Sequence, residues 1–86
     1  MLKFKYTISG FETMNWFDSL QAFLAVAQIK SFSKAAAILE LPSSVVTKRI
    51  QWLEAQVETT LFHRTTRKVM LTEMGEYMEK RVAPII

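Results

Sequence analysis

The sequence predicts a mainly α-helical fold with one small β-hairpin, and two observations lead to this prediction. From residue 16 onward, apolar residues recur at helical spacing in separate segments. Before the last of these segments, two short β-prone runs, LFHR at 61–64 and VML at 69–71, flank the polar stretch TTRK. Half of the 86 residues are apolar, which suffices for one small packed domain and argues against disorder.

The first 13 residues show a different pattern from the rest. Their apolar side chains alternate with polar ones and comprise Leu2, Phe4, Tyr6 and Ile8. A period of two is typical of a β-strand. Residues 1–13 are therefore either an added edge strand or a flexible leader before a start at Met14, and we assign this N-terminal extension no function.

The first predicted helix covers residues 16–29, where the apolar side chains fall on one helical face. Ser33 is a suitable N-cap for a shorter second helix that runs through Glu40. Pro42 ends this helix, because the residue before a proline is pushed out of the α region.

The third predicted helix covers residues 43–57, with Ser43 or Ser44 as its N-cap. One stripe of this helix is apolar and consists of Val46, Ile50, Leu53 and Val57. The opposite side is polar and consists of Ser44, Thr47, Lys48 and Gln51. That side carries no carboxylate, whereas a solvated helix face usually mixes both signs of charge. It is therefore suited to a partner rich in negative charge and hydrogen-bond acceptors.

Two helices joined by a short turn form a helix-turn-helix, whose second helix enters the major groove of DNA. The charge distribution agrees with this interpretation. Residues 30–68 contain seven Lys and Arg against three Glu, whereas residues 1–29 are neutral overall. A basic centre of this kind suits nucleic acid or an acidic protein surface.

The hairpin at residues 61–71 carries Arg67 and Lys68 at or near its tip, which is the arrangement of a wing. Thr72 is a suitable N-cap for a fourth helix, and Pro84 must end or kink that helix near Ala83. An apolar stripe on the fourth helix needs a cover, and a second copy of the chain can supply it. The stripe contains Met74, Tyr77, Met78 and Val82.

From Met14 to about Val82, the chain resembles the N-terminal DNA-binding domain of LysR-type transcriptional regulators. The resemblance rests on three segments, which are LQAFLAVAQIKSFSKAA (20–36), VVTKRIQWLE (45–54) and LFHRTTRKVMLTEMGE (61–76). It implies a winged helix-turn-helix at residues 14–71 and the start of a linker, or dimerisation, helix at residues 72–86. In this family two linker helices pair to form a dimer.

The family resemblance also implies a C-terminal effector-binding domain, which is absent from these 86 residues. We therefore expect an effector small molecule only for a longer parent protein. The expected partners are double-stranded DNA and a second copy of the chain.

These interpretations give a set of candidate DNA contacts. Ser43, Ser44, Thr47 and Lys48 are the candidates for base contacts. Ser33, Lys34, Arg49 and Arg64 are the candidates for phosphate contacts; the family places a phosphate-binding cation at the position of Lys34. Arg67 and Lys68 are the candidates for the minor groove, where a narrow A-tract attracts cations.

Six of these candidates also have an ordinary structural explanation. Lys48 and Thr47 can belong to a solvated helix face, and Ser43 or Ser44 can simply cap the helix. Arg49 and Arg64 can each form a surface ion pair with a carboxylate.

Three positions depart from the usual family pattern. Ser43 replaces an amide side chain that often contacts a base. Lys48 stands where arginine is usual, and lysine cannot bind guanine O6 and N7 as a two-pronged donor. Glu58 replaces a glycine that is common before the wing, so we expect the turn after the third helix to differ.

Two alternatives remain open at this point. A molybdate-repressor-like winged helix would bind DNA in the same way. A protein-interaction winged helix would instead use the wing and Trp52, which could cover the wing or contact another protein.

Enzymatic function is not expected. The sequence contains no nucleophile–base pair, no phosphate-binding loop and no metal-ligand set, and its single histidine, His63, lacks a neighbouring carboxylate pair. We therefore predict no catalytic residue, no cofactor and no metal. The absence of cysteine and of a membrane-length apolar run favours a cytoplasmic protein.

Overall fold

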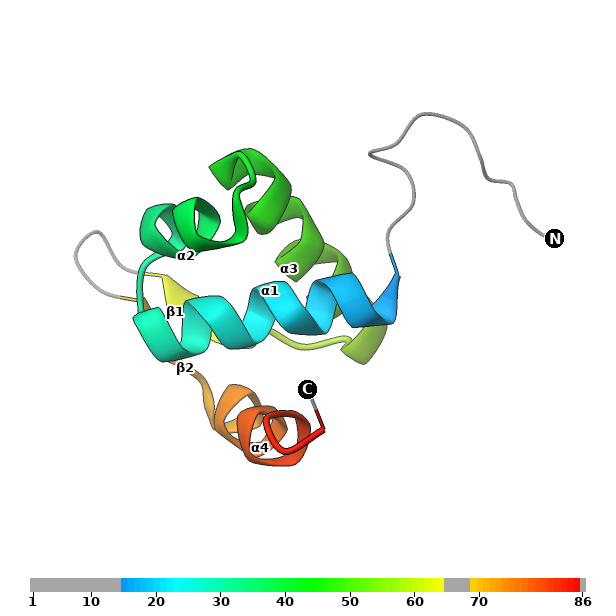
Figure 1. Cartoon of the computed structure of the whole chain (residues 1–86). Coiled ribbons are helices and arrows are strands. Elements are labelled where there is room, and N and C mark those ends of the chain that lie inside the picture. Colours follow the sequence, from blue (N-terminus) through cyan, green and yellow to red (C-terminus); the bar gives the residue numbers. More distant parts are fainter. Residues whose placement is uncertain (1–14, 65–68, 86) are drawn as a thin grey trace, which may run out of the picture.

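The computed structural model describes residues 15–64 and 69–85. Four helices and a two-stranded antiparallel sheet make up the described fold, as predicted (Figure 1). In chain order the elements are α1 (Trp16–Ile29), α2 (Phe32–Leu39), α3 (Ser43–Val57), β1 (Phe62–Arg64), β2 (Val69–Leu71) and α4 (Glu73–Val82). Residues 1–14, 65–68 and 86 lie outside the described residues, and so do the two structural alternatives for residues 1–13.

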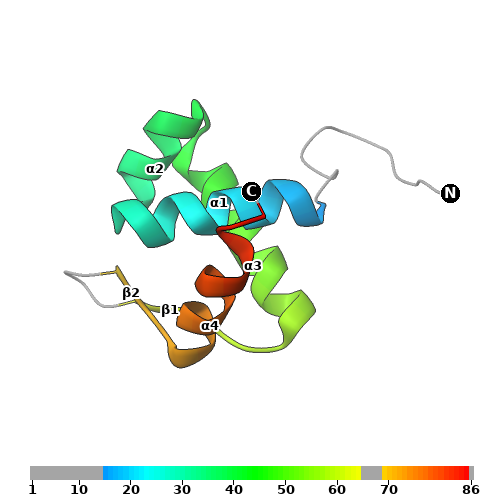
Figure 2. The ribbon, with the colours of Figure 1, turned by 60° about the horizontal axis from the view of Figure 1, so that its bottom comes forward.

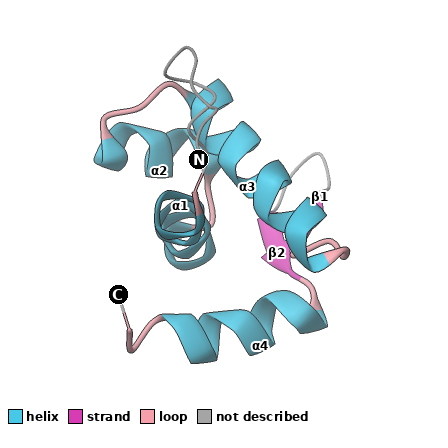
Figure 3. Ribbon diagram, turned by 90° about the vertical axis from the view of Figure 1, so that its right-hand side faces the viewer, coloured by secondary structure: helices cyan, strands magenta, loops and turns pink. Residues whose placement is uncertain are grey.

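Helix α1 forms the centre of the core. Phe23 and Val26 are completely buried, and α1 contacts α2, α3 and α4. Figure 3 shows α1 almost end-on, with α2 and α3 on one side and α4 on the other. The helix begins at Asn15, whose side-chain oxygen accepts a hydrogen bond from the Asp18 N–H at 2.8 Å. This is an ordinary capping bond of a first helical turn.

Helix α2 begins two residues earlier than a Ser33 cap would require, so that prediction is wrong. Ser31 is the N-cap, and its hydroxyl accepts a hydrogen bond from the Lys34 N–H at 3.1 Å. The earlier start places Phe32 in the helix, where its ring packs edge-on against Phe62 with ring centroids 5.8 Å apart. The contact of Phe32 with Phe62 is thus compatible with Ser31, and not Ser33, as the cap.

Helix α3 has the predicted bounds, but neither Ser43 nor Ser44 is its N-cap. Pro42 occupies that position, and the helix begins without a side-chain capping bond. Proline suits the start of a helix because its missing N–H would lack an intrahelical partner there. Val46, Ile50 and Leu53 are completely buried, as the sequence pattern predicts.

Three helices end in a left-handed residue that is not glycine. These residues are Lys30, Glu40 and Glu58, with φ of 63°, 60° and 58°. Residues with a Cβ adopt this conformation at a cost of about 1–2 kcal/mol. The turn after α3 was expected to differ because Glu58 replaces glycine, yet Glu58 adopts the conformation that glycine favours.

The hairpin and α4 follow the predicted order. Phe62 pairs with Leu71 and Arg64 with Val69 in the antiparallel ladder. Thr72 caps α4 as predicted, accepting a hydrogen bond from the Gly75 N–H at 3.0 Å. Seen from the direction of Figure 2, α4 lies in front of the three-helix body. No helix in the described ranges is long and apolar enough to cross a membrane.

Candidate nucleic-acid interface

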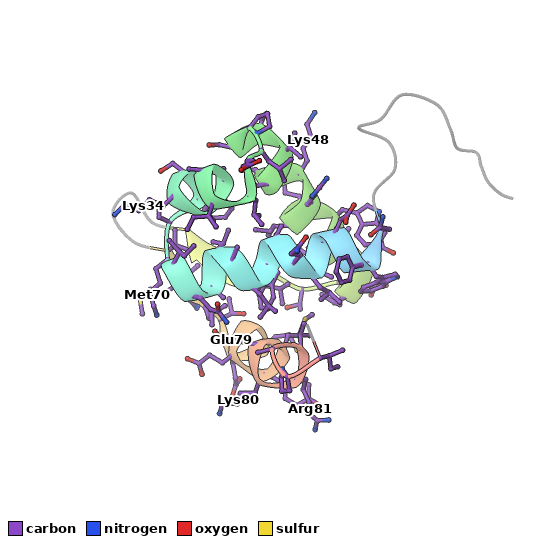
Figure 4. All side chains as sticks on the ribbon, in the orientation of Figure 1. Lys34, Lys48, Met70, Glu79, Lys80 and Arg81 are labelled. Carbon is purple, nitrogen blue, oxygen red and sulfur yellow. The ribbon has the colours of Figure 1, made fainter. Side chains whose placement is uncertain are left out.

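The outer face of α3 is polar and accessible. Ser44, Lys48 and Gln51 are exposed on the side opposite the buried stripe. Figure 4 shows Lys48 projecting from the body near the start of α3, whereas Lys80 and Arg81 project from α4 on the opposite side of the molecule. Glu54 is the one acidic residue of α3, and it lies off this face. The face therefore presents a cation, hydroxyls and an amide, and the single carboxylate of α3 is not among them.

The other base-contact candidates flank this face. Ser43 is exposed in the first turn, and Thr47 is half-buried on the edge of the helix. Because Pro42 serves as the N-cap, these serines are not required for capping. Capping, the ordinary explanation for Ser43 and Ser44, is therefore wrong. Both side chains are exposed in the first turn of α3.

Arg49 lies on the flank of α3 that faces the start of α1. Its Nη2 atom is 3.9 Å from Oδ2 of Asp18, and the two side chains are 23% and 34% exposed. Asp18 Oδ2 also accepts a hydrogen bond from Asn15 Nδ2 at 3.3 Å. Arg49 therefore forms a long ion pair with a carboxylate that Asn15 orients. A partly exposed pair at this distance stabilises the fold only weakly.

Lys34 and Ser33 are both exposed near the start of α2. Lys34 lies in the first turn, where its positive charge opposes the helix dipole. Figure 4 shows this side chain at the hairpin end of the molecule. A bound anion such as a DNA phosphate would relieve the local repulsion.

Trp52 has a structural partner within the chain. Its ring meets that of Trp16 in an edge-to-face arrangement, with centroids 5.3 Å apart. Trp52 therefore joins α3 to α1. The two roles left open for it by the sequence, covering the wing or contacting another protein, stay predictions.

The wing is described only in part. Arg64 is the last residue of β1, and its predicted phosphate contact stays a prediction. Arg67 and Lys68 lie outside the described residues.

The four candidates for the dimer helix separate into two pairs. Met78 and Val82 are half-buried against the core of their own subunit. Met74 and Tyr77 remain 43% and 53% exposed, and the Arg81 guanidinium lies 4.8 Å from the centre of the Tyr77 ring. Of these four candidates, Met74 and Tyr77 are therefore the most accessible to a second copy.

An open groove of about 700 Å³ runs beside this exposed pair. It is lined by Thr59, Thr60, His63, Thr72, Glu73, Met74 and Tyr77. In the described part of the chain, no group of three or more histidine or acidic residues could hold a metal ion. Among the described residues, the groove therefore contains no set of side chains that could bind a metal ion.

Sequence reasoning missed two residues that organise this region. Glu54 accepts a hydrogen bond from the Leu61 N–H, and Gly75 sits directly against the Leu61 carbonyl. A lone acidic residue on a basic helix, and a glycine within the first turn of a helix where it is costly, were signals that could have identified them.

Comparison with known proteins agrees with this geometry. Residues 17–76, more than half of the chain, match the family of bacterial regulatory helix-turn-helix proteins of the lysR type. The uncharacterized HTH-type transcriptional regulator YhjC of Escherichia coli is 40% identical over 73 residues, which cover 85% of this chain and 24% of YhjC. The HTH-type transcriptional regulator YofA of Bacillus velezensis is 51% identical over 61 residues, covering 71% of this chain and 21% of YofA. The chain thus spans less than a quarter of these two relatives.

Solved structures give the same result. The DNA-binding domain of CbnR in complex with DNA has a TM-score of 0.78 and 30% identity, covering 83% of this chain and 82% of that one. The DNA-binding domain of BenM in complex with benA site 1 DNA has a TM-score of 0.78 and 28% identity, covering 83% and 80%. The resemblance seen in the sequence is confirmed, and the chain belongs to the lysR family of bacterial regulatory helix-turn-helix proteins.

Proposed function

We propose that this chain is the DNA-binding domain of a LysR-type transcriptional regulator that reads specific DNA sequences with α3. The carrying observation is the outer face of α3, where Lys48 and its hydroxyl and amide neighbours are exposed opposite a fully buried stripe. Two solved relatives of the same fold are complexes with DNA. No enzymatic activity is proposed, since the family description names a regulator.

In this proposal α3 lies in the major groove, and Ser43, Ser44, Thr47 and Lys48 meet base edges. Ser33 and Lys34 at the start of α2 contact phosphates, which position the domain without reading sequence. Arg49 and Arg64 add phosphate contacts, and Arg67 and Lys68 enter the adjacent minor groove. Because Arg49 already faces Asp18, its contact with phosphate competes with that ion pair.

The DNA-binding unit is proposed to comprise residues 14–71, with residues 72–86 beginning a dimerisation helix. The exposed pair Met74 and Tyr77 supports a dimer, because a second copy would remove these side chains from water. A two-fold dimer requires an operator with an inverted repeat. The parent protein would act in the cytoplasm, where bacterial DNA lies, with its effector bound by a further domain.

Fluorescence anisotropy on a mixed-sequence duplex, repeated from about 50 to 200 mM salt, tests DNA binding directly. We expect affinity to fall linearly with salt on logarithmic axes, because several phosphate contacts release counterions. No binding at the lowest salt would contradict the proposed function for this chain. If the domain binds, selection from random duplexes would identify its preferred site.

Lys48→Ala tests base reading. On the selected site it should weaken binding by roughly 1–3 kcal/mol and relax one base position. Lys80→Ala is the matched control, because it removes an exposed lysine from α4 on the opposite side of the molecule. Equal losses for Lys48→Ala on selected and random DNA would show that Lys48 contacts only phosphate.

A further inference from the structure

The backbone of Leu61 is held from two sides. Its N–H donates a hydrogen bond to Oε2 of Glu54 in α3 at 2.8 Å. Its carbonyl oxygen accepts a hydrogen bond from the Thr72 N–H at 3.0 Å, immediately before α4. The Leu61 side chain is completely buried in the core. One residue at the base of the hairpin is thus joined to both the recognition helix and the fourth helix.

Helix α4 is fastened to the same place by two further features. The Thr72 hydroxyl donates a hydrogen bond to the Thr60 carbonyl at 2.9 Å. Gly75 lies so close that an added Cβ would collide with the Leu61 carbonyl oxygen and lie 2.8 Å from Cδ2 of Leu71. These contacts therefore fix the start of α4 in space relative to residues 60–61.

The contact from Glu54 spans a short loop. Helix α3 ends at Val57, the chain turns at the left-handed residue Glu58, and Leu61 follows three residues later. A hydrogen bond to a carboxylate is stronger than one between neutral groups, and this one is partly buried. The bond to Glu54 therefore restrains the base of the hairpin, in addition to the short loop that joins it to α3.

The charge of Glu54 gives this contact a further meaning. It is the only acidic residue of α3, in a helix whose outer face is proposed to approach DNA phosphates. A carboxylate on such a helix repels phosphates, so its presence calls for a different role. Its bond to Leu61 directs the carboxylate toward the base of the hairpin and away from the outer face.

We propose that Glu54 is a positioning residue for DNA binding, which fixes the hairpin relative to the outer face of α3 through the Leu61 peptide. Lys48 on α3 and the hairpin strands β1 and β2 then keep one arrangement when a duplex binds. This inference rests on the proposed function. It adds that the position of the hairpin relative to α3 depends on a side chain that touches no DNA.

Hydrogen–deuterium exchange on the free chain tests the positioning without DNA. In Glu54→Ala, the β1 and β2 amides should exchange about tenfold faster or more, while the α1 amides keep their protection. Glu54→Gln is the matched variant, because its amide oxygen can still accept the Leu61 N–H while the charge is lost. It should resemble the original chain. Unchanged hairpin exchange in Glu54→Ala would overturn the proposal.

A double-mutant cycle then tests the consequence for DNA binding. Glu54→Ala should weaken binding to a duplex about threefold to tenfold, and it should add no further loss when Arg67 and Lys68 are already alanine. Removing a carboxylate by itself strengthens DNA binding, so a loss cannot come from charge. Independent, additive losses would overturn the coupling. If the unchanged chain binds no DNA, the proposed function fails, while the exchange experiment still decides the structural link.

Discussion

Helices α1–α3 and helix α4 bury their apolar side chains to very different extents. The three-helix body contains fully buried side chains from α1 and α3, among them Phe23, Ile50 and Leu53. In α4 only Gly75 is fully buried, and Met74 and Tyr77 face outward. The body therefore completes its core within one chain. The fourth helix is fastened at its start, packs Met78 and Val82 against the core, and leaves Met74 and Tyr77 exposed.

The largest expected effect is a truncation inside the three-helix body. Ile50→Ala should lower the free energy of unfolding by about 2–5 kcal/mol, because it removes a fully buried side chain and leaves a cavity. Chemical denaturation followed by circular dichroism measures this. Tyr77→Ala on α4 is the control and should cost less than about 1 kcal/mol in the monomer. A Tyr77→Ala loss that grows with protein concentration would show that a second copy covers this residue.

Gly75→Ala should destabilise α4 more than it destabilises the three-helix body. The new Cβ collides with the Leu61 carbonyl, which is backbone and cannot turn aside as a flexible side chain can. We expect a loss of about 1–3 kcal/mol from the resulting backbone shift, with the α4 amides losing protection before those of α1. Glu76→Ala, at a neighbouring exposed position, should change stability by less than about 0.5 kcal/mol. Equal loss of protection in α1 and α4 would mean that the fourth helix is part of a single cooperative unit.

Glu58→Gly tests the connection between the regions. Because Glu58 already adopts φ 58°, glycine removes the Cβ strain, and we expect a gain of about 0.5–1 kcal/mol after the entropy of the unfolded chain is included. Denaturant unfolding at unchanged m-value measures this gain. Glu58→Ala should give no comparable gain, since alanine retains the Cβ.

The smallest expected effect lies in the core. The hydroxyl of Ser19 is completely buried and has no hydrogen-bond partner among the described residues. Ser19→Ala should therefore leave stability unchanged or raise it by up to about 1 kcal/mol, because an unsatisfied buried hydroxyl is costly. A clear loss in thermal unfolding would indicate that Ser19 Oγ has a partner, for example an ordered water.

The helices could be predicted from the sequence with good accuracy because their apolar periodicity is strong. The bounds 16–29 and 43–57 agree with α1 and α3 at both ends. The cap of α2 could not be predicted, because Ser31 and Ser33 are chemically equal candidates. The choice depends on Phe32 reaching Phe62, a residue 30 positions away in the chain.

The residues of the candidate site were only partly predictable from the sequence. The outward position of Lys48 follows from helical spacing alone, and the structure agrees. The separation of Met74 and Tyr77 from Met78 and Val82 depends on how α4 lies against α1, which periodicity does not reveal. Likewise, the bond between Glu54 and Leu61 requires a turn that brings residues seven positions apart into contact.

The contact between Trp16 and Trp52 gives the domain a built-in optical probe. The chain contains two tryptophans, and both lie in this one edge-to-face pair between α1 and α3. All of its indole fluorescence therefore originates where the recognition helix meets the first helix. Any event that shifts α3 against α1, from unfolding to the arrival of a duplex, should change the emission without a label being attached.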